Sequence, residues 1–507
     1  MADRPHNLIG GERADAAAGG VFEDCNPANR ADILGAFPRS DHRDIDRAVE
    51  VARAGYRAWN DVLPSERTTI LLRAAGLLRG AEEALAALIV RDGGAVQADA
   101  RREVQGAVEI LVDSAGEASR AALVGLPRDA RGGLAFGLRV PVGVVAVIGS
   151  WRYPLSGLLR QIAPALASGC AVVAKPAEET PMVAARLVEI LLEAGVLPAA
   201  VGLVHGTGEE AGAPMIRHPD VALVSFSGSA AVGREVAIAC AAEHKPLQME
   251  LGGRSATMVL EDSDMEAAVE GAIEGAMAMA GQRWAPATRL LVHRKVIREF
   301  GERLVTRAQS LRVGDGLSPE VNLGPLIKDL CLKRAHAYTR QTLKDGGRLL
   351  LGGEVLREGE YRKGFFYAPT ILSEVLPTMR AVRDPAFGPI AALLAIAGME
   401  EGLEVARQIG VRFGLALYTQ RTDRVYRAVE QTSARFLTVN APPPTGGPLE
   451  IATWHGGGSG AGGDIYTERR TVTLRSGRPG RRGGGHPHGG TPSEPGAGVS
   501  ASERSGD

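Results

Sequence analysis

The chain has 507 residues, 45% of them hydrophobic and 23% charged, so it can bury a large core in two or three domains. Its formal net charge is -1, which gives no global attraction to nucleic acid or to an anionic membrane. The four cysteines (Cys25, Cys170, Cys240 and Cys331) lie far apart without a CxxC pair or a Cys/His cluster, which argues against a disulfide framework and predicts no metal site.

The first third of the chain is predicted to be mostly helical. Residues 1–20 lack an apolar stretch behind a basic one, and no run of about 18 or more apolar residues occurs later, so we expect a cytoplasmic protein without a membrane span. Apolar residues recur at intervals of three and four in the segments 44–60, 65–94 and 98–122, which predicts helices there.

From residue 139 the pattern changes to strands that alternate with helices. Strands are expected at 139–149, 170–176 and 221–229, and helices at 153–169 and 180–195. The second helix has Thr180 as its predicted N-cap and Pro181 in its first turn. Strands joined by helices of this length predict right-handed crossovers and a parallel, doubly wound sheet.

A second alternation of strands and helices begins near residue 254 and predicts a second α/β domain. Its expected strands are 255–261, 288–293, 414–420 and 436–440, and its expected helices are 264–281 and 295–311. The tail at 476–507 is rich in Gly, Pro, Arg and Ser and holds one apolar side chain besides alanines, so we predict that it is disordered. Its arginines could contact an anion, but its composition favours a solvated linker.

Seven motifs in this order resemble those of the aldehyde dehydrogenases. They are "VPVGVVAVIGSWRYPL", "KPAEETP", "FSGSAAVGR", "MELGG", "GQRWAPATR", "FGPI" and "FGLALYTQ", and the resemblance covers roughly residues 8 to 475. It implies an α/β fold with a Rossmann-like NAD-binding domain (1–120 and 141–251), a catalytic domain (252–450) and a small β oligomerisation arm (121–140 and 464–475).

The resemblance implies cofactor contacts along the first sheet. Lys175 and Glu178 would bond the adenosine ribose, and an acid at 178 favours NAD over NADP because it repels a 2′-phosphate. A surface salt bridge between these two residues is the alternative. Gly206, Gly208 and Gly212 form a GxGxxxG pattern that suits a phosphate at a helix N-terminus, although a loop that needs positive φ explains the glycines equally well.

Further cofactor contacts are implied at Trp151, Ser229 and Phe387. Ser229 opens a helix and suits a pyrophosphate, and a plain N-cap is nearly as good an explanation. Where the family places a glutamate on the nicotinamide ribose, two residues before Phe387, this chain has Pro385, which offers no acceptor side chain. Asp384 is adjacent, but a neighbouring residue points elsewhere. We therefore expect NAD binding that is weak or vestigial.

The catalytic positions implied by the resemblance differ more strongly. Glu250 stands at the position of the general base, but Trp284 stands where the family has its nucleophilic cysteine. An indole only donates a hydrogen bond and cannot attack a carbonyl carbon. Arg152 replaces the asparagine of the oxyanion hole, where a cation would oppose the charged nicotinamide or pair with Glu250. Arg283 is expected to form a surface or tunnel-mouth salt bridge.

These substitutions predict a catalytically inactive family member, a pseudoenzyme in which Trp284 plugs the aldehyde tunnel. The four cysteines are expected to be small buried hydrophobes rather than displaced nucleophiles. We expect a nucleotide-binding structural or regulatory subunit that forms a homo-oligomer through the arm, or assembles with an active relative, with no nucleic-acid or membrane partner. The alternatives are NAD-dependent oxidation of an aldehyde to a carboxylic acid, through some other nucleophile, and weak ester hydrolysis by water activated at Glu250.

Overall fold

The computed structural model describes residues 5–118, 123–125, 134–384, 386–443 and 464–474. The predicted tail (476–507) and Pro385 lie outside the described residues. Internal contacts divide the chain into one unit of residues 1–122 and 139–470 and a second of residues 123–138 and 471–507.

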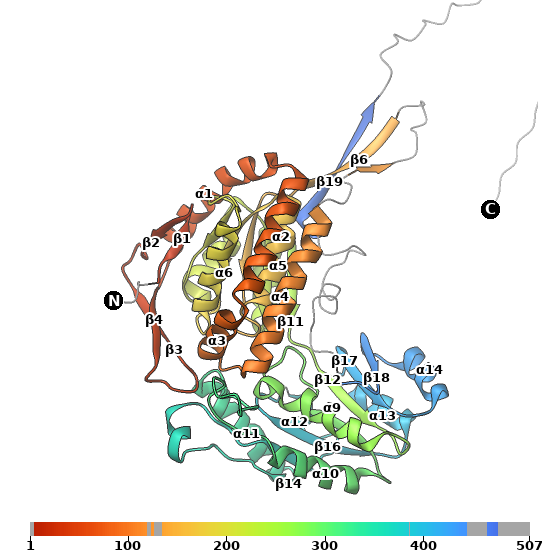
Figure 1. Cartoon of the computed structure of the whole chain (residues 1–507). Coiled ribbons are helices and arrows are strands. Elements are labelled where there is room, and N and C mark those ends of the chain that lie inside the picture. Colours follow the sequence, from red (N-terminus) through yellow and green to blue (C-terminus); the bar gives the residue numbers. More distant parts are fainter. Residues whose placement is uncertain (1–4, 119–122, 126–133, 385, 444–463, 475–507) are drawn as a thin grey trace, which may run out of the picture. The chain divides into compact units, whose positions relative to one another are not determined.

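The first sheet of the larger unit has seven strands in the order β11-β10-β7-β8-β9-β1-β2. Figure 1 shows β1 and β2 beside α1. Its strands are β1 (Asn7–Ile9), β2 (Glu12–Ala14), β7 (Val144–Ile148), β8 (Ala171–Lys175), β9 (Val201–Leu203), β10 (Val221–Gly228) and β11 (Leu247–Leu251). From β7 to β11 all pairs are parallel, whereas β1 is antiparallel to both of its neighbours. The chain runs from β7 outward to β9 and then returns to β10 on the other side of β7, so the topological switch point lies between β7 and β10.

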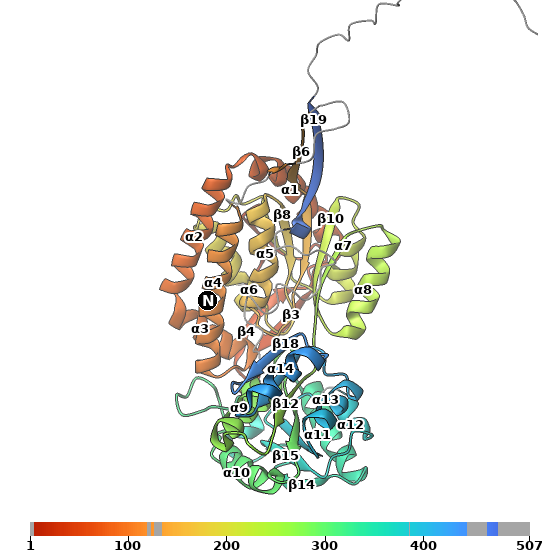
Figure 2. The same ribbon diagram turned by 90° about the vertical axis from the view of Figure 1, so that its right-hand side faces the viewer.

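Helices cover both faces of this sheet (Figure 2). They are α1 (His42–Asp61), α2 (Pro64–Gly80), α3 (Glu82–Gly93), α4 (Gln97–Ala118), α5 (Ser156–Ser168), α6 (Pro181–Glu193), α7 (Ala213–Arg217) and α8 (Ala230–Ala242). Val145 and Val147 of β7 pack with α2 to α6, whereas Val144 and Ala146 pack with α1, α7 and α8. Because successive side chains of a strand alternate between its faces, a sheet buried on both sides needs such uninterrupted apolar strands.

The second sheet of the larger unit has the strand order β14-β15-β16-β13-β12-β17-β18. Its strands are β12 (Ser255–Val259), β13 (Arg289–His293), β14 (Arg348–Leu351), β15 (Thr370–Ser373), β16 (Ile390–Ile396), β17 (Gly414–Tyr418) and β18 (Phe436–Val439). Its helices are α9 (Met265–Met277), α10 (Ile297–Gln309), α11 (Asp329–Lys344), α12 (Arg380–Arg383), α13 (Met399–Gln408) and α14 (Thr422–Gln431). One apolar core joins these helices to the sheet.

Two small sheets complete the described structure. The strands β3 (Val21–Cys25) and β4 (Ile33–Pro38) form an antiparallel pair, and a three-stranded sheet has the order β19-β6-β5. Its strands are β5 (Leu123–Gly125), β6 (Leu134–Pro141) and β19 (Thr467–Leu474). No helix within the described ranges is long and apolar enough to cross a membrane.

The predicted α/β, doubly wound fold class is confirmed, with differences in detail. The strand predicted at 139–149 is divided, because β6 ends at Pro141 and β7 begins at Val144, with Gly143 at a φ of 127° between them. Thr180 is the N-cap of α6 as predicted, but its hydroxyl makes no capping bond. Instead the carboxylate of Asp92 in α3 accepts from the backbone N–H of Val183 at 2.8 Å. A residue distant in sequence therefore satisfies this helix end, which local sequence patterns do not reveal.

Two helical glycines test how tightly α1 packs. A Cβ on Gly55 in α1 would lie 2.1 Å from the carbonyl oxygen of Ala199, whereas a Cβ on Gly76 in α2 would meet nothing within 4 Å. We expect Gly55→Ala to lower the free energy of unfolding by about 1–3 kcal/mol, since backbone must move to make room. Gly76→Ala is the matched control and should raise it by up to about 1 kcal/mol. Urea unfolding measures both, and similar shifts for the two variants would contradict this packing.

Candidate active site

Several of the predicted site residues lie at the carboxyl ends of the strands of the first sheet. Trp151 and Arg152 follow β7, Lys175 ends β8, and Ser229 follows β10. The parallel register pairs Ile148 with Phe226, so the loops after β7 and β10 begin side by side. Open α/β sheets bind ligands at the carboxyl ends of their strands, beside a topological switch point. The carboxyl end of this sheet is therefore the candidate site.

Lys175 is buried at the end of β8. Its Nζ donates to the carbonyl oxygens of Pro176 at 2.6 Å and Gly206 at 2.8 Å, and burial lowers its pKa. Nζ lies 3.9 Å from a carboxylate oxygen of Glu178, whose side chain is half exposed. The two residues thus form a loose ion pair, which is the alternative to ribose binding that the sequence left open. The Glu178 carboxylate is still partly exposed to solvent.

The glycine-rich loop begins with backbone that favours glycine. Gly206 has a φ of 150°, and a Cβ there would lie 2.9 Å from the Cβ of Ala211. The next segment is a π-helical turn, η1 (Gly208–Gly212), and not a long helix. Glu209 and Glu210 lie in its first turn, where their charges oppose a bound phosphate. Gly206 therefore serves the turn, whereas Gly208 has room for a side chain, and the acidic first turn makes a poor phosphate cradle.

The N-terminus of α8 is the better place for an anion. Ser229 caps it by accepting a hydrogen bond from the backbone N–H of Val232 at 3.3 Å. Residues 229–232 are exposed, and the first turn carries no acidic side chain. A solvent-facing helix start of this kind attracts negative charge. Ser229 therefore acts as an N-cap, which was one of its two predicted roles. The residue remains exposed to solvent.

Glu250 in β11 forms a buried ion pair with Arg160 of α5. Nε of Arg160 lies 3.1 Å from Oε1 of Glu250, and their side chains are only 7% and 5% exposed. Oε2 of Glu250 has no hydrogen-bond partner in the described part of the chain. Burial raises the pKa of Glu250, and Arg160 offsets only part of that rise. The suggestion that Arg152 would pair with Glu250 is wrong, because Arg160 takes that place.

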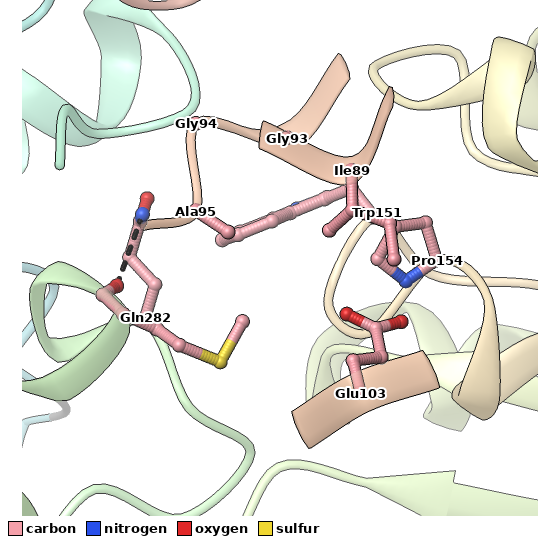
Figure 3. Close-up of a pocket in the computed structure, with 9 residues that line it drawn as sticks. Ile89, Gly93, Gly94, Ala95, Glu103, Trp151, Pro154 and Gln282 are labelled. Carbon is pink, nitrogen blue, oxygen red and sulfur yellow. Dashed lines mark hydrogen bonds between the residues drawn. The ribbon is translucent and has the colours of Figure 1, made fainter. Parts of the chain in front are cut away.

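Helix α5, which carries Arg160, is capped from another helix. Oε1 of Glu103 in α4 accepts from the backbone N–H groups of Leu155 at 2.8 Å and Ser156 at 3.1 Å. Glu103 also lines a narrow pocket with Trp151 and Pro154 that has room for about one water molecule (Figure 3). In that view its carboxyl group points toward Pro154. Burial raises the pKa of Glu103 to about 7.

Trp284 is held by an unusual loop after α9. Met279 and Ala280 have φ values of 52° and 53°, and Gly281 follows at 71°. A Cβ on Gly281 would lie 1.9 Å from the carbonyl oxygen of Gly388, so only glycine fits there. The Trp284 side chain is 3% exposed and packs with Phe413. Its indole fills the interior at the position predicted for the nucleophile.

Arg283, beside Trp284, forms an ion pair that is less exposed than predicted. Its Nη2 lies 3.2 Å from a carboxylate oxygen of Glu274 in α9, and its side chain is 6% exposed. Nε and Nη1 have no hydrogen-bond partner among the residues that the structure describes. The expected salt bridge is therefore present, but it is buried.

Arg152 stacks on the two aromatic rings predicted to contact the cofactor. Its guanidinium carbon lies 5.0 Å from the ring centroid of Trp151 and 5.6 Å from that of Phe387. Nη1 also donates to the carbonyl oxygen of Arg283 at 3.3 Å. Burial lowers the pKa of Arg152 to about 10, so it stays charged at neutral pH. A cation thus covers both rings.

Asp384 does not replace the acceptor that is missing at position 385, and no cysteine replaces the nucleophile that is missing at Trp284. The Asp384 carboxylate forms a surface ion pair with Arg380 at 3.2 Å. Burial raises the pKa of each of the four cysteines, to about 11 for Cys170, so all are thiols at neutral pH. Cys331 in α11 lies near enough to Arg152 and Arg334 for their charges to oppose this rise, but burial dominates. Cys25 is half-buried and the other three are buried.

A dinucleotide fits the carboxyl end of this sheet only in part. The free N-terminus of α8 and the exposed carboxylate of Glu178 suit a pyrophosphate and a ribose. The faces of Trp151 and Phe387 are covered by the Arg152 cation, which repels a positively charged nicotinamide ring. The nicotinamide half therefore does not fit the side chains as they stand.

With this geometry in place, comparison with known proteins identifies the family. A model of the aldehyde dehydrogenase family matches residues 14–469. The chain belongs to the aldehyde dehydrogenase family. It is 31% identical to the alpha-ketoglutaric semialdehyde dehydrogenase of Bacillus subtilis (strain 168) over 92% of this chain and 98% of that protein.

Solved structures of the family agree with this fold. An aldehyde dehydrogenase from Bacillus cereus in complex with NAD+ is 29% identical, with a TM-score of 0.86 over 93% of this chain and 96% of that one. PnpE from Pseudomonas sp. WBC-3 is 30% identical, with a TM-score of 0.86 over 93% and 98% of the two chains.

Two residues of the site were not found from the sequence. Arg160 interrupts the apolar run "GLLRQIAPALA" in a helix whose residues 156–167 are all buried, and a lone charge in such a helix was an available signal. Glu103 lies on a helix far from α5 in sequence, and nothing local marks it as a cap. Both act on the position of Glu250, one directly and one through α5.

The raised pKa of Glu103 predicts a pH dependence of stability. The folded chain holds this proton more tightly than the unfolded chain, so the contribution of Glu103 is complete below its ordinary pKa of 4.5 and is lost as the pH rises through about 7. Glu103→Gln keeps an acceptor for the helix and does not titrate. Between pH 5 and 8.5 the native chain should therefore lose up to about 3 kcal/mol relative to this variant in urea unfolding.

Glu109→Gln, at an exposed position of the same helix, is the control and should follow the native chain at every pH. Parallel pH profiles for the native chain and Glu103→Gln would show that Glu103 does not titrate in this range.

Proposed function

We propose that this protein is an aldehyde dehydrogenase family member that has lost the covalent dehydrogenase reaction and works as a nucleotide-binding structural or regulatory subunit. The main support is the buried indole of Trp284 at the nucleophile position, together with the buried Arg160–Glu250 ion pair at the base position. In the family mechanism a thiolate attacks the aldehyde and a carboxylate activates water. Here the first group is an indole and the second is bound to a guanidinium.

Each side chain at the site argues against that reaction for its own physical reason. Trp284 has no nucleophilic lone pair, and its ring is buried at the position where the family has its thiol. Glu250 is paired with Arg160 through Oε1, and the charge of Arg160 opposes protonation of the carboxylate, which makes it a poorer base. Arg152 could hold an oxyanion, but none forms without a nucleophile.

The competing proposal is NAD-dependent oxidation of an aldehyde to a carboxylic acid. It is supported by the name of the Bacillus subtilis relative and by the structure of a relative with NAD+ bound. It requires a substitute nucleophile. Of the four thiols, Cys331 is the one that interacts electrostatically with Arg152. The two proposals therefore differ in whether the pure protein oxidises an aldehyde.

The proposal extends to cofactor, assembly and location. Binding of NAD is weak, with NAD preferred over NADP because Glu178 presents a carboxylate to a 2′-phosphate. The chain forms a homo-oligomer, or a mixed assembly with an active relative, through the strands β5, β6 and β19. A reducing, cytoplasmic location agrees with four unpaired cysteines.

Aldehyde oxidation by the pure protein decides between the two proposals. With NAD and short aliphatic or aromatic aldehydes, or alpha-ketoglutaric semialdehyde, we expect turnover below about 0.1 per second, far under typical enzyme values. NADH absorbance at saturating aldehyde measures it. Faster turnover that disappears in Cys331→Ser would establish the competing proposal, with Cys331 as the nucleophile.

Restoring a thiol alone should not restore activity. Trp284→Cys supplies the nucleophile, but Glu250 remains paired with Arg160 and Arg152 still covers the aromatic rings. We expect turnover to stay below about 0.1 per second, with Trp284→Phe as the control for folding. If Trp284→Cys alone became an efficient dehydrogenase, the ion pair would not be what silences the site.

A further inference from the structure

We propose that the loop of residues 278–284 is a conformational switch. It keeps Trp284 inside the protein while Asp99 of α4 is bound to it, and it moves Trp284 toward solvent when that contact breaks. The inference concerns how the indole is held in place. It therefore goes beyond the proposed loss of the dehydrogenase reaction, and its test does not use the aldehyde assay.

The backbone of this loop has an unfavourable conformation. Met279 (φ 52°, ψ 35°) and Ala280 (φ 53°, ψ 36°) both lie in the left-handed region, which residues with a Cβ rarely adopt. Residues in such conformations persist only where the surrounding structure fixes them, and they are typical of ligand sites and switch regions. The loop would therefore relax if the contacts that fix it were lost.

One of these contacts comes from α4. Oδ2 of Asp99 accepts a hydrogen bond from the backbone N–H of Met279 at 3.1 Å, and Oδ1 forms an ion pair with Arg102. The side chain of Asp99 is only 7% exposed, so water competes little for its oxygens. Helix α4 packs in the core of the first sheet, whereas α9, which leads into the loop, packs in the core of the second. The loop is therefore held by an element outside its own core.

A chain of ion pairs connects Asp99 to the residue beside Trp284. Nη1 of Arg102 lies 3.2 Å from Oε1 of Glu274 in α9, and the same oxygen lies 3.2 Å from Nη2 of Arg283. The side chains of Arg102 and Glu274 are 55% and 32% exposed, whereas that of Arg283 is buried. A change at the exposed end of this chain can therefore reach the buried end of the loop.

The enclosed position of Trp284 leaves polar groups unpaired. Nε1 of Trp284 and both Nε and Nη1 of Arg283 have no hydrogen-bond partner within the described ranges. A buried donor without a partner is unfavourable, and exposure to water would satisfy it. These donors and the backbone of Met279 and Ala280 thus favour an open loop.

Other contacts favour the closed loop. The Trp284 ring packs with Phe413. The side chain of Gln282 accepts from the backbone N–H of Ile327 at 2.9 Å and donates to the carbonyl oxygen of Pro325 at 3.3 Å. Opposing contributions of this kind give a two-state element whose balance a single contact can shift. We assign that role to the bond from Met279 to Asp99.

A cavity beside the loop gives it room to move. Its volume is about 460 Å³, and its walls include Ala278 at the start of the loop and all three of Asp99, Arg102 and Glu274. The loop can therefore change conformation on this side without displacing a packed core.

Hydrogen exchange of the full-length protein, measured by mass spectrometry, tests the proposal. In the native chain we expect the amides of residues 279–287 to exchange through a local opening, faster than those of β13, which exchange on global unfolding. Asp99→Ala should speed exchange of residues 279–287 at least about tenfold and leave β13 unchanged. Glu109→Ala, at an exposed position of the same helix, is the control and should exchange like the native chain.

A second variant tests the backbone conformation without removing Asp99. Ala280→Gly relieves the left-handed residue in the closed loop and should slow exchange of residues 279–287 at least about threefold. Ala278→Gly is the matched control, because Ala278 has an ordinary φ of -59°, and it should not slow exchange.

Three results would overturn the proposal. Residues 279–287 would exchange no faster than β13 in the native chain, Asp99→Ala would behave like Glu109→Ala, or Ala280→Gly would slow exchange no more than Ala278→Gly. Each of these results leaves the proposed loss of the dehydrogenase reaction in place, because that proposal depends on which residue stands at position 284. Aldehyde turnover would remove the proposed function and leave the exchange result to decide the switch.

Discussion

The site depends on one buried interaction, the ion pair between Arg160 and Glu250. A carboxylate as deeply buried as Glu250 is costly without a partner, and its raised pKa shows the direction of that cost. Arg160 reduces the cost through Oε1, and its charge opposes protonation of the carboxylate. Removing either charge leaves the other buried and unpaired, so the pair is maintained by its contribution to stability.

The pair is positioned by parts of the chain that are far apart in sequence. Glu250 comes from β11 at one edge of the first sheet, and Arg160 comes from α5, which covers one face of that sheet. The start of α5 is in turn fixed by Glu103 of α4. On the other side, the strained loop before Trp284 places this residue, and the backbone carbonyl oxygen of Trp284 accepts from the N–H of Gly253, just beyond β11, at 3.0 Å. The base position is therefore held from both sides.

The sequence predicted the architecture well because that architecture depends on local patterns. Uninterrupted apolar strands between helices, such as "AVVAK", indicate a sheet buried on both faces, and the structure has it. Trp284 is buried as expected, whereas the strand β11, which carries Glu250, was not predicted. The division of 139–149 between two sheets was missed, since an apolar run does not say where its pairing partner changes.

What the sequence could not predict is which charges meet. Arg152 and Arg160 are eight residues apart, and both are arginines near the site. Only the direction of α5 decides that Arg160 reaches Glu250 while Arg152 turns to Trp151 and Phe387. The cap of α6 by Asp92 is a similar case, because its partner helix is set by tertiary packing.

A double-mutant cycle on Arg160 and Glu250 tests this account most directly. Urea unfolding would be measured for Arg160→Met, Glu250→Gln and the double variant. We expect each single change to cost about 3–5 kcal/mol and the double variant to cost clearly less than their sum, with a coupling of more than about 1.5 kcal/mol. Additive single effects would contradict the account, because they would show that Arg160 does not stabilise the buried Glu250 carboxylate.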